Sequence, residues 1–87
     1  MDYRDRLRWL RGSYGMTQTA FAKMLGVSVK RWNHYERGYS VPHKAMRLLC
    51  EKTGAMPDWI YFGWEGNMPR ALLWKIRTVQ VRDACHR

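Results

Sequence analysis

Hydrophobic residues recur along this 87-residue chain at spacings of three and four, which is the period of an α-helix with one buried side. No segment shows a clear strand pattern. The spacing, together with Gly and Pro between the periodic stretches, predicts helices over residues 2–14, 18–25, 28–37, 42–53, 57–62 and 68–84. The expected fold class is therefore all-α.

Residue types at the helix ends support these boundaries. Thr17 and Ser28 precede the second and third helices, and their hydroxyls can accept from unpaired backbone N–H groups of the first turn. Gly26 follows the second helix, where a positive φ is common. Pro42 is expected to be the first residue of the fourth helix, because its missing N–H needs no partner there.

The apolar stripes indicate which side of each helix is buried. In the first helix the stripe consists of Tyr3, Leu7, Leu10 and Tyr14. Trp9 lies nearly opposite that stripe. In the fourth helix the stripe is expected to consist of Ala45, Leu48, Leu49 and Lys52, with Met46 and Cys50 on its flanks.

The last helix carries a stripe that has two interpretations. It consists of Leu72, Leu73, Ile76 and Val79, with Trp74 beside it. The stripe can fold back onto the first helix and cover Trp9, or it can pair with a second copy of the chain. Residues 68–87 hold five Lys or Arg against one Asp, a charge that mildly opposes self-association.

The charge of the chain points to an anionic partner. The formal net charge is +9, and residues 23–47 alone hold six Lys or Arg against one Glu. Such an excess on a small domain favours nucleic acid or, less often, an acidic membrane surface. The apolar stripe of the first helix is needed for the core, which argues against a membrane-surface helix.

Residues 18–37 form two helices joined by a short turn that contains Gly26, which is the helix-turn-helix pattern. Trp32 and Tyr35 are three positions apart and share a side of the third helix, which favours core packing over stacking on single-stranded bases. Glu36 is expected to pair within the domain, because a carboxylate facing phosphate is unfavourable.

Residues 5–63 resemble the Cro/C1-type, or XRE-like, helix-turn-helix family, whose fold is lambda-repressor-like. The motifs that carry the resemblance are Leu7, Leu10, Arg11, Met16-Thr17-Gln18, Phe21-Ala22, Leu25-Gly26-Val27-Ser28, Tyr35-Glu36-Arg37-Gly38, Pro42 and Pro57-Asp58-Trp59-Ile60. The resemblance implies a five-helix DNA-binding domain over residues 1–63. Residues 64–87 lie outside the family pattern and form an extension.

The resemblance also implies which residues contact DNA. Family members place the helix over 28–37 in the major groove. The residues expected to contact bases are Val29, Lys30, Asn33 and His34. Asn suits adenine, Lys suits guanine, and Val can touch a thymine methyl. The residues expected to hold phosphates are Thr17, Gln18, Ser28, Arg31, Arg37 and Lys44.

The function expected from these features is that of a cytoplasmic, sequence-specific regulator of transcription that binds double-stranded DNA. Because one recognition helix reads few base pairs, a homodimer on an inverted repeat is expected. The alternative is a protein-interaction module, such as an antitoxin-like partner of another protein, which the Trp-rich segment 59–74 would serve.

Nothing in the sequence predicts catalysis or a cofactor. Cys50 and Cys85 have no CxxC spacing, and with the three His residues they form no zinc-ligand pattern. Cys50 is expected to be a buried, reduced thiol. No apolar run approaches the roughly 20 residues of a membrane span. We therefore expect a protein that is not an enzyme, that binds no metal and that does not span a membrane.

Overall fold

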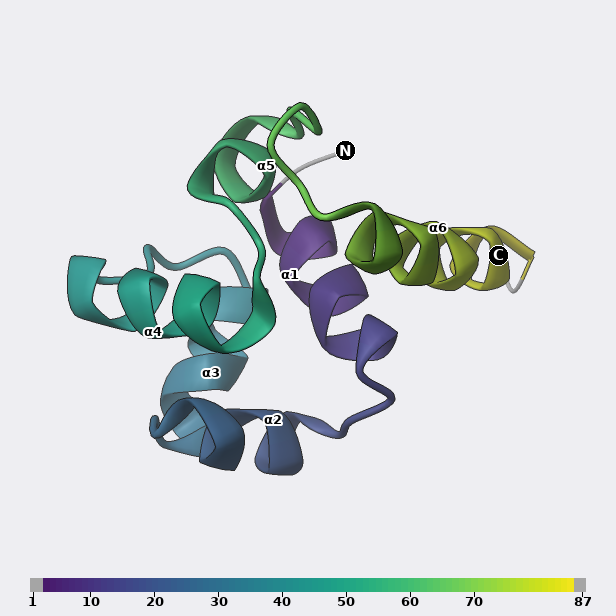
Figure 1. The fold of residues 1–87 in the computed structure, drawn as a ribbon. Coiled ribbons are helices and arrows are strands. Elements are labelled where there is room, and N and C mark those ends of the chain that lie inside the picture. The colour runs from purple at the N-terminus through teal and green to yellow at the C-terminus, as the bar shows by residue number, and fades with distance from the viewer. Residues whose placement is uncertain (1–2, 86–87) are drawn as a thin grey trace.

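The computed structural model describes residues 3–85 and is all-α, as predicted (Figure 1). Its helices are α1 (Tyr3–Ser13), α2 (Gln18–Leu25), α3 (Val29–Glu36), α4 (His43–Thr53), α5 (Pro57–Phe62) and α6 (Arg70–Cys85). The observed ends lie within two residues of the predicted ones, and no strand occurs between residues 3 and 85.

The predicted caps account for these boundaries. The Thr17 hydroxyl accepts from the backbone N–H of Ala20 at 3.2 Å, and the Ser28 hydroxyl accepts from that of Arg31 at 3.1 Å. Gly26 ends α2 with φ of +80°, a conformation that favours glycine. The placement of Pro42 as the first helical residue is wrong by one position, because Pro42 is extended and is itself the N-cap of α4.

Helix α1 lies in the centre of the molecule and packs against α3, α5 and α6 (Figure 1). Leu7 and Leu10 of its apolar stripe have no exposed surface. Trp9, on the opposite side, is also buried. Because α1 contacts other helices on several sides, a large aromatic residue outside its main apolar stripe can also be buried.

The stripe of α6 folds back onto α1. Leu72 and Ile76 are buried in the core, and Val79 lies against Gly12 of α1. The Trp9 indole N–H donates to the Asp83 carboxylate at 3.5 Å. The first of the two interpretations of this stripe is therefore confirmed, and the stripe is not available to a second copy.

The buried side of α4 differs from the predicted one. The residues of α4 that are buried are Met46, Leu49 and Thr53, while Ala45 and Leu48 are half-buried and Lys52 is exposed. Thr53 can be buried because its hydroxyl donates to the Leu49 carbonyl at 2.7 Å and accepts from the Ala55 N–H at 3.1 Å. Met46, which was predicted to lie on the flank of the α4 stripe, therefore packs in the core.

A buried arginine joins α1 to α5. The Arg6 guanidinium donates from Nε to the Ile60 carbonyl at 2.7 Å and from Nη2 to the Tyr61 carbonyl at 2.8 Å. Both carbonyls lie near the C-terminal end of α5, where backbone oxygens lack helical partners and carry partial negative charge. Arg6 thus stabilises the end of a six-residue helix that is too short to be stable alone.

Candidate nucleic-acid interface

Helices α2 and α3 cross at small and aromatic residues. Ala22 is 1% exposed at the crossing, and the rings of Phe21 and Trp32 lie 4.9 Å apart. Tyr35 meets Trp32 edge-on at 6.1 Å. Since both Trp32 and Tyr35 are buried, they pack the core and cannot stack on single-stranded bases.

A buried carboxylate holds α3 against α1 and α2. Glu36 accepts from Nε of Arg11 at 2.7 Å and from Nη2 at 3.1 Å, and it also accepts from the indole N–H of Trp32. The side-chain amide of Gln18 donates to the same carboxylate at 3.3 Å. The prediction that Glu36 pairs within the domain is confirmed. This bidentate, charge-assisted pair fixes the orientation of α3.

Asn33 belongs to the same hydrogen-bond network. Its Nδ2 donates to Oε1 of Gln18 at 3.0 Å, so a residue expected to contact a base is joined to one expected to hold a phosphate. An Asn amide has two N–H donors and an acceptor oxygen. Among residues 3–85, Gln18 is the one residue whose side chain bonds to the Asn33 amide. One N–H donor and the acceptor oxygen of this amide therefore stay available for a further partner.

The structure places the predicted contact residues at the surface of α2, α3, their caps and the first turn of α4. Those with exposed side chains are Thr17, Ser28, Val29, Lys30, Arg31, Arg37 and Lys44, and the half-buried ones are Gln18, Asn33 and His34. Arg31 and Lys44 border one hollow of about 230 Å³ between the start of α3 and α4, and no acidic residue lines it. These two cations therefore converge from different helices.

Tyr39, in the loop after α3, is an exposed residue of this region that the sequence did not predict. Its ring lies 5.3 Å from that of His34, and its side chain is 64% exposed. A tyrosine hydroxyl is a common donor to phosphate oxygens. The only signal in the sequence was an aromatic residue directly after the motif, at Gly38-Tyr39.

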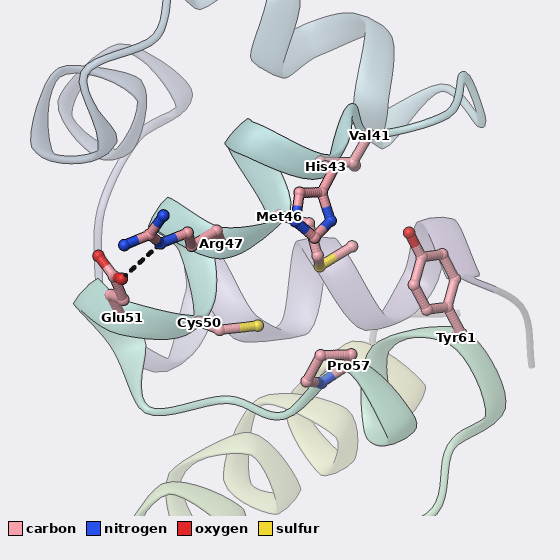
Figure 2. Close-up of a pocket in the computed structure, with 8 residues that line it drawn as sticks. All are labelled: Val41, His43, Met46, Arg47, Cys50, Glu51, Pro57 and Tyr61. Carbon is pink, nitrogen blue, oxygen red and sulfur yellow. Dashed lines mark hydrogen bonds and ion pairs between the residues drawn. The ribbon is translucent and has the colours of Figure 1, made fainter.

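A hollow away from the motif lies between α4 and α5. Its volume is about 460 Å³, and it is lined by Val41, His43, Met46, Arg47, Cys50, Glu51, Pro57 and Tyr61. Figure 2 shows Met46 and Cys50 projecting from α4 toward the space that Pro57 and Tyr61 border. Burial raises the pKa of the Cys50 thiol, which favours the protonated form.

Among residues 3–85, no group of three or more His, Cys, Asp or Glu side chains is placed to hold a metal ion. No helix in this part of the chain has the length and apolar character needed to cross a membrane.

Comparison with known proteins identifies the family of the chain. No curated protein and no solved structure matches it. The helix-turn-helix domain family, however, matches residues 2–58, which include α1, both helices of the motif and α4. This match is consistent with the resemblance to Cro/C1-type regulators. The chain belongs to the helix-turn-helix domain family.

Proposed function

We propose that this protein is a cytoplasmic regulator of transcription that binds double-stranded DNA in a sequence-specific manner. The observation that carries the proposal is the position of α3. Its apolar side is fixed in the core by Trp32, Tyr35 and the buried Glu36, while its polar side and basic N-terminal turn face solvent. A rigid helix with exposed hydrogen-bonding side chains fits the width of the major groove.

Base readout is assigned to Val29, Lys30, Asn33 and His34. Val29 and Lys30 lie in the first turn of α3 and are exposed. Asn33 lies one turn further, where its bond to Gln18 orients the amide and leaves a donor and the acceptor for adenine N7 and N6. The half-buried His34 next to Tyr39 completes this side of the helix.

Phosphate contacts are assigned to residues on α3 and in the segments around it. These are Thr17, Gln18, Ser28, Arg31, Arg37 and Lys44. Thr17 and Ser28 cap helices whose first-turn N–H groups attract anions, and Arg31 and Lys44 add charge from neighbouring elements. Neutralisation of several phosphates releases counterions, so the affinity should fall steeply as salt is raised.

The protein is proposed to bind an inverted repeat as a homodimer. One eight-residue recognition helix contacts only a few base pairs, and two copies related by a two-fold axis double the sequence that is read. No catalytic role is assigned to any residue. This is in line with the typically non-enzymatic role of helix-turn-helix domains.

The experiment that tests this function is selection from a random duplex library. We expect enrichment of an inverted repeat at moderate salt. The Lys30→Ala/Asn33→Ala variant is expected to stay folded and to lose that preference. If the wild-type protein enriches no duplex sequence, or if both proteins enrich the same one, the proposed readout by α3 is wrong.

A second candidate function is a protein-interaction module, and exposed aromatic side chains outside the motif favour it. Phe62, Trp64 and Trp74 are each more than 60% exposed, which is unusual for such large apolar residues. Co-purification of a stoichiometric protein partner that does not require DNA would support this role. It is compatible with DNA binding by α3.

A further inference from the structure

Two surface patches outside the DNA-binding motif expose aromatic side chains. The α5 patch consists of Tyr61, Phe62 and Trp64, with the acidic residues Asp58 and Glu65 beside them. The α6 patch consists of Trp74 and Val81, with the basic residues Arg70 and Arg77. Phe62 is 62% exposed, Trp64 is 63% exposed and Trp74 is 73% exposed, so none of the three rings is used by the core.

The aromatic rings of the α5 patch form a continuous row. The rings of Phe62 and Trp64 stack with centroids 4.7 Å apart, and Tyr61 and Phe62 lie 6.3 Å apart. The row continues to Tyr3, whose ring stacks on Tyr61 at 5.7 Å. Residues 57–67 contain Asp58 and Glu65 but no Lys or Arg. This patch is therefore apolar and acidic on a chain that is otherwise strongly basic.

The α6 patch has the opposite charge. Trp74 borders two hollows, one of about 360 Å³ that Arg70 and Arg77 also line and one of about 300 Å³ that Arg77 and Val81 also line. No acidic residue lines either hollow. Hollows next to an exposed ring, with guanidinium groups at their edges, can accept aromatic rings that carry acidic neighbours.

The two patches adjoin each other within one molecule. The Arg77 guanidinium of the α6 patch donates to the Glu65 carboxylate beside the α5 patch at 2.9 Å. This exposed pair places the two patches side by side in one protomer. In a reciprocal contact between two copies, the two-fold axis would pass between them.

We propose that a second copy of this chain docks here, with the α5 patch of each protomer on the α6 patch of the other. This proposal rests on the proposed function. It names the surface that joins the two protomers on an inverted repeat. A two-fold axis makes the contact reciprocal, so both patches of both protomers are covered and the assembly closes at two copies.

Charge selects this occupant over others. Pairing of two α6 patches would bring four arginines together, and nucleic acid has no cation to meet at the α5 patch. The three exposed rings would bury on the order of 400 Å² per protomer, at roughly 100–150 Å² each. That is about half of what one partner contributes to a standard interface of ~800 Å² per side. The remainder can come from the flanking residues.

The arrangement leaves the motif uncovered. Figure 1 shows α5 and the loop after it at one end of the molecule, with α2 and α3 at the other. Covering the two patches therefore does not block the exposed side of α3.

The test uses two full-length variants that each lose one patch. Phe62→Ser/Trp64→Ser removes the α5 patch, and Trp74→Glu removes the α6 patch. Because every contact needs one patch of each kind, both contacts are lost when either variant pairs with itself. A mixture of the two variants retains one intact contact. We expect each variant alone to self-associate roughly a hundredfold more weakly than wild type, as for loss of hot-spot aromatics, and a 1:1 mixture to form a heterodimer.

Sedimentation velocity without DNA, with one variant fluorescently labelled, measures this association. The matched control is Tyr39→Ser, which removes an equally exposed aromatic outside both patches and should self-associate like wild type. The proposal is overturned if either patch variant dimerises like wild type, if the mixture forms no heterodimer, or if wild type forms open polymers. Binding of the two patch variants to a single half-site is measured separately, so failure of DNA recognition is distinguished from failure of the interface.

Discussion

The side-chain amide of Asn33 in α3 donates to Gln18 at the start of α2 with an N···O distance of 3.0 Å. Gln18 donates in turn to the buried carboxylate of Glu36. A side chain assigned to base readout is therefore oriented through one that is assigned to phosphate binding. We therefore expect recognition and positioning to be coupled, and the coupling can be measured.

Replacement of Asn33 by Ala is expected to cost about 1–3 kcal/mol of binding free energy at one base pair of the site, because a bidentate contact to adenine is lost. Preference at that position should be relaxed while the others keep theirs. Binding to duplexes substituted at single positions measures the effect. Equal losses on all sequences would contradict a base contact.

Replacement of Gln18 by Ala is expected to weaken binding to every sequence and, in addition, to reduce discrimination at the position read by Asn33. The second effect arises because the Asn33 amide loses its acceptor. A double-mutant cycle of Gln18→Ala and Asn33→Ala should show a coupling energy of about 0.5 kcal/mol or more. Additive losses would mean that Gln18 only contacts phosphate.

The Glu36→Ala variant is expected to lose about 2–4 kcal/mol of unfolding free energy. The substitution leaves the partly buried Arg11 guanidinium and the Trp32 indole N–H without their acceptor. Urea unfolding measures the loss. The control is Glu51→Ala, whose pair with Arg47 is exposed and should contribute less than about 0.5 kcal/mol.

The Gly12→Ala variant is expected to lose roughly 1–2 kcal/mol of unfolding free energy, although alanine normally stabilises a helix. A Cβ at position 12 would lie 2.9 Å from Cγ1 of Val79, so α6 would have to move off α1. Thermal unfolding, followed by far-UV circular dichroism, measures the change.

The compensating change is Val79→Ala. It removes the methyl groups that the new Cβ would meet, so the double variant should be more stable than the sum of the two single losses predicts. Additivity would show that position 12 does not contact α6.

The free energy of unfolding is expected to fall between pH 10 and pH 12, in part because Tyr3 ionises. Burial raises the pKa of the Tyr3 hydroxyl to about 12, although the hydrogen bond that this oxygen accepts from the Val41 N–H opposes the shift. Folding favours the neutral phenol. The free energy of unfolding that Tyr3 contributes is therefore fully present below the unfolded pKa of 10.0, and it is lost as the pH rises through the folded pKa. The Tyr3→Phe variant should therefore show a shallower decline in unfolding free energy over this range. An unchanged slope would contradict the assignment.

The sequence predicted the local features of the fold well. Helix ends were readable because their signals lie within a few positions: Thr17 and Ser28 cap their own first turns, and Gly26 has the positive φ of a helix end. The burial of Trp32 and Tyr35 was readable because both follow the helical period.

Long-range relationships were harder to predict. The periodicity of α6 showed an apolar stripe but not whether α1 or a second copy covers it. The buried side of α4 was predicted wrongly because Thr53 is a polar residue in the sequence. Its hydroxyl bonds to neighbouring backbone groups, and these bonds allow it to be buried. The bonds of Arg6 join positions more than fifty residues apart, a relationship that no local pattern contains.

The central position of α1 has a consequence for synthesis of the chain. Its contacts are made with α3, α5 and α6, and the bond from Trp9 to Asp83 spans 74 positions. At about 5–20 residues per second, a ribosome needs roughly 4–15 s to add those positions. During that time α1 lacks the contact with α6 that it has in the finished protein. We therefore expect the nascent α1 to be accessible to chaperones that bind short apolar segments until α6 emerges.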